Sequence, residues 1–304
     1  MLNLKRLVLS FIVLGFTSSA FATMENEIFW QAKSGENFFT PSFEYNSQSL
    51  EFEGGTKSDL SLPTTGLQYE YGFNEMLSFG AELAYTFGTT EVEAGGNTTE
   101  SDTDGLEDIE IFAKGQMELD SNSSFHFGAA LGLGLGDSET DEDGNDNRSS
   151  GRIGLTPYVG YVRNMGPGWI GARLSYQFFL TEESEVDKSQ TPDQESSFSN
   201  GETLFLTAFY EMPMAWGLLG FNVQYQARSE RKLTELNGAE QNDVSQNDDF
   251  NAIAFTVYPR YKINDMITLV GEATYGFLTN DELSGTNLDS SAIFSISAGA
   301  RIQI

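Results

Sequence analysis

The sequence contains no cysteine, and this excludes two kinds of covalent chemistry. The chain can form no disulfide bond, and it offers no thiol for attachment of a lipid. It also has no run of 18 or more consecutive apolar residues. Because a membrane-spanning helix needs about 20 such residues, the sequence predicts no transmembrane helix.

Basic residues are scarce: 16 Lys and Arg stand against 45 Asp and Glu, for a formal net charge of −29. A protein this acidic repels nucleic acids and anionic phosphates, so we expect no nucleic-acid partner. The 304 residues include 31 glycines and show little helix-type periodicity. This composition is typical of one large all-β unit.

The N-terminus has the pattern of an export signal. Lys5 and Arg6 precede an apolar run over residues 7–16, and Ala20-Phe21-Ala22 provides small residues around a cleavage site. The pattern predicts a signal peptide over residues 1–22, although an uncleaved anchor remains an alternative. We expect a periplasmic N-terminal tail over 23–37 and the main fold over 38–304.

The last ten residues, SISAGARIQI, alternate between small or apolar and polar side chains. A period of two predicts a strand with two different faces. Eleven other segments alternate in the same way, and all are long enough to cross a membrane as tilted strands, which takes roughly 9–11 residues. The twelve segments cover about 38–53, 62–73, 76–90, 106–119, 124–136, 151–164, 168–181, 201–213, 217–230, 250–263, 266–279 and 290–304.

The connections between these segments are of two kinds. Five are short and rich in turn-forming residues; they lie at 74–75, 120–123, 165–168, 214–217 and 264–265. Five are long and hold 26 acidic residues against four basic ones; they lie at 91–105, 137–150, 182–200, 230–249 and 280–289. This asymmetry predicts a transmembrane antiparallel up-and-down β-barrel of about 12 strands in the bacterial outer membrane, with short periplasmic turns and long acidic outer loops. A soluble β-sandwich, with the apolar parity in its core, is the alternative.

In the barrel, the apolar parity faces lipid and the polar parity faces the lumen. Aromatic residues gather near both ends of the strands, as in the two aromatic belts of membrane barrels. The charged residues with inward parity are Glu44, Glu70, Glu82, Asp108, Glu110, Glu118, Glu211, Glu272, Lys114, Arg152, Arg173, Arg228, Arg260, Lys262 and Arg301. Among them, Glu82, Glu110, Lys114, Arg152, Arg173, Arg228, Arg260 and Arg301 are the main pore-lining candidates.

These charges indicate two possible functions. Opposed acidic and basic rows across a lumen would form a polar constriction for passive uptake of small solutes through a porin-like channel. If the same residues instead pair across a narrow lumen, the barrel is a plugged structural or surface-interaction protein. Twelve strands give an intermediate bore, between the filled eight-stranded barrel and the open 16-stranded one.

The C-terminal strand resembles the assembly signal of bacterial outer-membrane proteins. Ser297, Gly299, Ile302 and Ile304 fill its four places, although the usual terminal residue is aromatic. The resemblance implies that the barrel assembly machinery is a partner, together with outer-membrane lipid and lipopolysaccharide. In a closed barrel, the last strand pairs with the first, near ENFFTPSFEYNSQ.

A narrower resemblance is found in DGLEDIEIFAKGQM and in GLGLGDSET. These stretches look like segments of the phenol-degradation meta-pathway transporter family of small channels, with Glu107 in place of a glycine. The resemblance implies an outer-membrane barrel that takes up hydrophobic or aromatic compounds. It implies no particular cargo, and the family has no ligand motif that transfers to this chain.

Little in the sequence indicates an enzyme. The only histidine, His126, has inward parity near a short turn and adjoins no serine motif. A nucleophilic site needs a base and an orienting partner, so we expect no enzymatic activity and no cofactor. Carboxylate-only chemistry stays open but lacks support.

An acidic stretch resembles a calcium-binding loop, and two prolines fall inside predicted strands. Glu139, Asp141 and Asp143 stand at calcium-loop positions 1, 3 and 5, but position 12 is Ser150 instead of the required glutamate. A solvated acidic loop is the favoured interpretation, and weak divalent-cation binding remains open. Pro157 and Pro259 fall inside predicted strands, where we expect bulges or a bent register.

Overall fold

The computed structural model describes residues 30–134, 138–141, 147, 151–166, 168–189, 192–247, 249–280, 282–283 and 286–304. The predicted signal peptide and residues 23–29 lie outside this part of the chain. No helix within these ranges has the length and apolar character needed to cross a bilayer.

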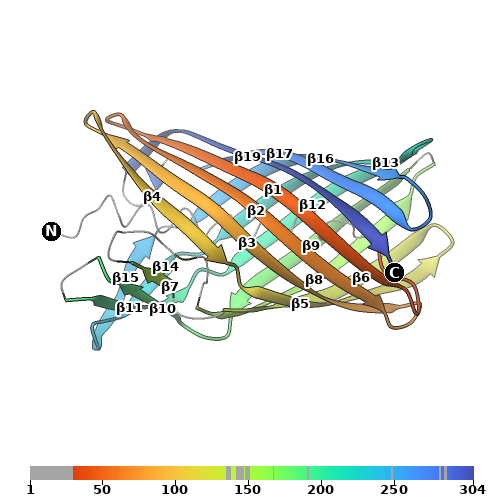
Figure 1. Ribbon diagram of the computed structural model, residues 1–304, viewed down its shortest axis with the longest axis horizontal. Coiled ribbons are helices and arrows are strands. Elements are labelled where there is room, and N and C mark those ends of the chain that lie inside the picture. The colour runs from red at the N-terminus through yellow and green to blue at the C-terminus, as the bar shows by residue number, and fades with distance from the viewer. Residues whose placement is uncertain are drawn as a thin grey trace.

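Twelve antiparallel strands form a closed barrel (Figure 1). The prediction of a twelve-stranded up-and-down barrel is confirmed, because each strand pairs with its neighbours in chain order and β1 closes the ring against β19. The strands are β1 (Asn37–Phe52), β2 (Thr56–Gly72), β3 (Leu77–Ala94), β5 (Ile109–Asp120), β6 (Ser123–Leu133), β8 (Ile153–Asn164), β9 (Trp169–Phe179), β12 (Thr203–Met214), β13 (Gly217–Arg228), β16 (Phe250–Lys262), β17 (Ile267–Leu278) and β19 (Thr286–Gln303).

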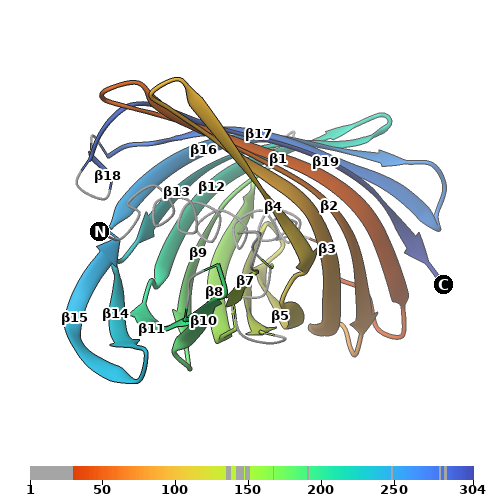
Figure 2. The ribbon, with the colours of Figure 1, turned by 60° about the vertical axis from the view of Figure 1, so that its left-hand side comes forward.

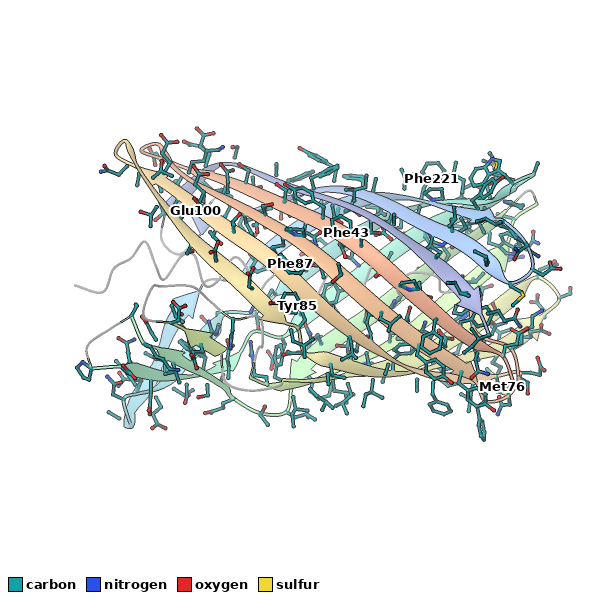
Figure 3. All side chains as sticks on the ribbon, viewed as in Figure 1. Phe43, Met76, Tyr85, Phe87, Glu100 and Phe221 are labelled. Atoms are coloured by element: carbon teal, nitrogen blue, oxygen red, sulfur yellow. The ribbon has the colours of Figure 1, made fainter. Side chains whose placement is uncertain are left out.

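Alternating side chains separate the two faces of the wall. Phe43, Phe87 and Phe221 project from the outer surface (Figure 3), and each is more than 40% exposed. On β9, Ile170 and Leu174 are exposed in the same way, whereas Arg173 between them is buried. Apolar side chains therefore face outward and polar ones inward, which is the arrangement of a membrane barrel and the reverse of a soluble sandwich.

Asparagine side chains stabilise two of the short turns. The Oδ1 atom of Asn74 accepts hydrogen bonds from the backbone N–H groups of Met76 and Leu77, at 2.8 and 2.9 Å. Asn264 binds Met266 and Ile267 in the same way and at the same distances. These short turns lie at one end of the barrel, which we call the turn end, and the long connections lie at the other, the loop end.

The loop end is more ordered than the sequence predicted. The strand β4 (Asn97–Leu106) extends the hairpin of β3. A separate five-stranded sheet follows the order β15-β14-β11-β10-β7 and lies at the end of the barrel opposite the C-terminus (Figures 1 and 2). The strands of this loop sheet are β7 (Ser138–Thr140), β10 (Glu183–Asp187), β11 (Gln194–Asn200), β14 (Arg231–Leu236) and β15 (Ala239–Asn247). One further short strand, β18 (Glu282–Leu283), pairs with β19.

Three of the long connections, which were predicted as acidic outer loops, contribute strands to this loop sheet. Phe198 and Leu233 are buried against each other, with Leu236 packed on them. Burial of these apolar side chains stabilises strands that the acidic composition alone does not predict.

The prediction of bulges at Pro157 and Pro259 is also wrong. Pairing between β8 and β9 passes from Leu155 to Tyr158 without a change of register. The pairing of β16 with β17 skips Pro259 in the same manner, and Pro259 stays paired with Leu219 on β13. A proline lacks only the N–H donor, so it loses pairing with one neighbour while the strand keeps its register.

Candidate functional site

The candidate site is the inner face of the barrel. The inward side chains of Glu82, Lys114, Arg152, Arg173, Arg228 and Arg260 are all buried, and those of Glu110 and Arg301 are half-buried. Glu44, Glu70, Glu211 and Glu272 are buried as well, and Asp108 is half-buried.

Two of the inward-parity residues are not lumenal. Glu118 and Lys262 are exposed because their strands end near them at the short turns. Lys262 binds Asp265 at 2.8 Å, and this side-chain hydrogen bond holds the pKa of Asp265 below its usual range. Parity alone does not show where a strand leaves the barrel, and this explains the error.

An ion pair lies inside the turn end. The Nζ atom of Lys114 is 2.9 Å from Oε2 of Glu70, and Ser78 donates a 2.7 Å hydrogen bond to Oε1. The backbone N–H of Ala32 donates to the same oxygen at 3.2 Å. Glu70 therefore connects two strands of the wall to the segment that precedes β1.

Trp30 lies against the same cluster. Its ring is 3.6 Å from the guanidinium carbon of Arg301 and 5.9 Å from Nζ of Lys114, distances at which cations are attracted to an indole. It also contacts Phe38 edge-on, with 4.9 Å between ring centroids. Trp30 and Ala32 thus pack against inward-facing residues, whereas Lys33 and Gly35 remain exposed. Trp30 was not predicted as an inward-facing residue because its segment has no alternation.

Polar side chains contact one another inside the turn-end half of the barrel. The guanidinium of Arg173 lies 4.2 Å from the ring of Tyr158. Tyr258 donates a 3.0 Å hydrogen bond to Glu211, and Arg260 donates one of equal length to the carbonyl of Gly271. These contacts meet part of the cost of removing polar groups from water.

The predicted basic residues do not form one row. Arg228 pairs in register with Phe250, and Arg260 stands ten residues further along the same strand. At about 3.4 Å per residue, the two positions are roughly 34 Å apart along the strand. Arg228 therefore lies at the loop end, whereas Arg260 and Arg301 lie towards the turn end.

A cluster of three arginines lies at the loop end; Arg152, Arg228 and Arg231 form this arginine cluster. Glu183 bridges two of them, with contacts of 2.7 Å to Arg152 and 2.8 Å to Arg231. The side chains of Glu183 and Arg231 are fully buried. Glu183 belongs to the loop sheet and Arg152 directly precedes β8, so the bridge ties the sheet to the barrel. Glu183 and Arg231 were predicted to lie in long acidic outer loops, and their contact was not predicted.

The inner wall becomes apolar next to this cluster. Leu50, Phe52, Phe250, Ala252 and Leu278 pack together as one buried group, which we call the apolar wall. These residues share the inward parity of polar residues lower on the same strands, such as Glu44 and Thr274. The polar-inside pattern used for prediction therefore fails at the loop end.

His126 and the predicted calcium loop are the remaining candidates for a catalytic or metal site. The Nε2 atom of His126 is 3.0 Å from Oγ of Ser124 on the same face of β6, a contact missed from sequence. Glu139 forms a 2.6 Å ion pair with Lys188, and Asp143 lies outside the described residues. Within the described part, no three His, Asp or Glu side chains are grouped to hold a metal ion.

The residues of the predicted assembly signal lie on β19 and just after it. Gly299 faces Ser42 and Val270 on the two neighbouring strands, and a Cβ there would lie 2.8 Å from the carbonyl oxygen of Pro41. Ile304 is exposed at the turn end. Recognition of Ser297, Gly299, Ile302 and Ile304 by an assembly machinery stays a prediction.

Comparison with known proteins identifies the fold. No family model and no curated protein matches the chain. The COG4313 outer membrane channel from Pseudomonas putida F1 is similar in structure, with 12% identity, a TM-score of 0.59 and coverage of 88% of this chain and 96% of that one. The CymD monoaromatic hydrocarbon channel matches with 9% identity, a TM-score of 0.47 and coverage of 92% of each chain. The NanC porin matches with 13% identity, a TM-score of 0.44 and coverage of 85% and 98%.

Proposed function

We propose that this protein is a channel of the bacterial outer membrane through which small solutes cross passively. The observation that carries the proposal is a closed wall, apolar outside and lined with charged and amide side chains inside. Charged and amide side chains that line a pore can select among polar solutes. Twelve strands enclose a wider bore than the eight strands of a filled barrel.

The distribution of inward charge supports a selective pathway. Glu82 and Glu110 face each other on β3 and β5. Arg173, Arg228 and Arg260 stand on β9, β13 and β16, which follow later in the ring. A solute in the lumen therefore meets carboxylates on β3 and β5 and guanidinium groups on β9, β13 and β16, with Glu211 and Glu272 on strands next to the latter.

The exterior supports an outer-membrane location. Rows of exposed apolar and aromatic side chains cover the strands, as a lipid-facing surface requires. We propose that outer-membrane lipid and lipopolysaccharide surround the barrel, and that the assembly machinery recognises the C-terminal strand. We also propose that residues 1–22 direct export of the protein and are then cleaved off.

The cargo we favour is a hydrophobic or aromatic compound. The apolar wall at the loop end offers such a solute a surface inside the barrel. The similar structure is itself described as an outer membrane channel, and the sequence resembles a transporter family linked to aromatic degradation. We propose no enzymatic activity for this protein.

A plugged scaffold is the second candidate, because Trp30 packs on Arg301 and beside Lys114 at the turn end. Conductance of purified protein in planar lipid bilayers separates the two functions. A channel gives stepwise currents, and Arg260→Glu shifts its ion selectivity towards cations, most clearly at 1 M salt, where exposed charges are screened within about 3 Å. Silent bilayers with a correctly folded barrel would favour the scaffold.

A further inference from the structure

Arg228 is a buried arginine whose charge is not matched. It is 7% exposed at the end of β13, and it forms no ion pair with any described residue. Its two companions in the arginine cluster, Arg152 and Arg231, both bind Glu183. A buried charge without a counter-ion is costly, so a partner for Arg228 stabilises the site.

The guanidinium of Arg228 packs closely against the backbone of Gly201. Gly201 has a φ of +85°, a conformation that favours glycine. A Cβ there would lie 3.3 Å from Nη2 of Arg228 and 3.9 Å from Nη1 of Arg152. A side chain at 201 would therefore crowd Arg228, and glycine lets the guanidinium groups of Arg228 and Arg152 lie close together.

The apolar wall lies beside the same arginine. The guanidinium carbon of Arg228 is 5.8 Å from the ring centroid of Phe250. Phe250 packs in turn with Leu50, Ala252 and Leu278. An unmatched positive charge and an apolar surface are thus adjacent on the inner face at the loop end.

We propose that this place binds a small amphipathic carboxylate, with its carboxylate at Arg228 and its apolar part on the apolar wall. An arginine binds a carboxylate through two parallel hydrogen bonds, which suits one unmatched guanidinium. The 26 acidic residues of the long connections repel multiply charged anions more strongly than singly charged ones. The proposal rests on the channel function and names its substrate class.

Binding is tested by isothermal titration calorimetry on the full mature chain in lipid nanodiscs. The probes are 4-phenylbutyrate, 4-phenylbutanol, which lacks the charge, and acetate, which lacks the apolar part. We expect 4-phenylbutyrate to bind at least ten-fold more tightly than either control. Arg228→Gln should lower its affinity at least ten-fold, Arg228→Lys should recover part of the loss, and Arg163→Gln, an exposed arginine at the turn end, should change nothing.

Each outcome decides between the two proposals. Equal binding by wild type and Arg228→Gln, or equal binding of 4-phenylbutyrate and 4-phenylbutanol, overturns the carboxylate site. Conductance in the same preparation without 4-phenylbutyrate binding overturns the site and leaves the channel. Silent bilayers with Arg228-dependent binding support the site and overturn the channel. Heat-modifiable migration of each variant shows that it is folded, and Phe250→Ala should weaken 4-phenylbutyrate while leaving acetate unchanged.

Discussion

Replacing Glu183 by glutamine should release the loop sheet from the barrel. Glu183 is fully buried and contacts Arg152 at 2.7 Å and Arg231 at 2.8 Å. The Glu183→Gln variant keeps the shape of the side chain but removes its charge. Three arginines then remain in one buried cluster, with Glu185, whose side chain is 18% exposed, as a counter-ion 3.3 Å from Arg231.

The magnitude follows from the cost of leaving buried charges unpaired. Removing one partner of a buried ion pair costs about 3–5 kcal/mol. At about 1.36 kcal/mol per tenfold change, local opening of the loop sheet should become at least ~100-fold more frequent. The barrel strands should stay folded, because their hydrogen bonds do not depend on this contact.

Limited proteolysis by proteinase K, with cleavage sites located by mass spectrometry, measures this opening. When opening is fast relative to cleavage, the cleavage rate follows the population of the open form. Lys188→Gln is the matched control, because it breaks an ion pair to Glu139 in which both side chains are about 40% exposed. Exposed pairs contribute at most about 1 kcal/mol, so this variant should be cut no more than about fivefold faster. Equal cleavage of the two variants within 182–200 and 230–247 would refute the reasoning.

Three further predictions concern the barrel wall, the turn end and the loop end. The folded protein should migrate differently from the boiled protein in detergent gels, because a closed hydrogen-bonded ring resists cold detergent, and a mainly helical circular-dichroism spectrum would contradict the fold. Trp30→Ala should raise single-channel conductance, since it removes the ring that covers Arg301, and an unchanged conductance would show that Trp30 does not restrict the turn end. Removing divalent cations with EDTA should raise protease sensitivity at the loop end, because 26 carboxylates repel one another there, and equal cleavage with EDTA, Ca²⁺ or Mg²⁺ would show that the cations do not bind.

The sequence predicted the barrel wall well because each strand carries its own signal. Alternation on β9, with Leu174 outside and Arg173 inside, depends on the period of a strand and needs no knowledge of distant contacts. The turns at Asn74 and Asn264 are also predictable from local sequence, because each asparagine side chain binds the backbone of the residue three positions later.

The interior could not be predicted as fully, because its contacts join residues far apart in sequence. Glu183 meets Arg152 and Arg231 only when two long connections fold onto the start of β8, and no local sequence pattern predicts this. Trp30 was missed for a similar reason, since its partners Arg301 and Lys114 stand on remote strands. The five-stranded loop sheet was not predicted, because its connections are mainly acidic and the contact of Phe198 with Leu233 joins two different connections.

The closing pair of strands has a consequence for how the chain folds. The hydrogen bond between Ser295 and Glu44 joins residues 251 positions apart. Bringing the ends of so long a loop together costs about 5 kcal/mol of chain entropy on the scale of (3/2)RT ln n. The thirteen register pairs of β1 with β19 offset this cost only when the last strand arrives. Ring closure is therefore the late and slow event of folding, and until then β1 presents an unpaired edge that other chains can reach.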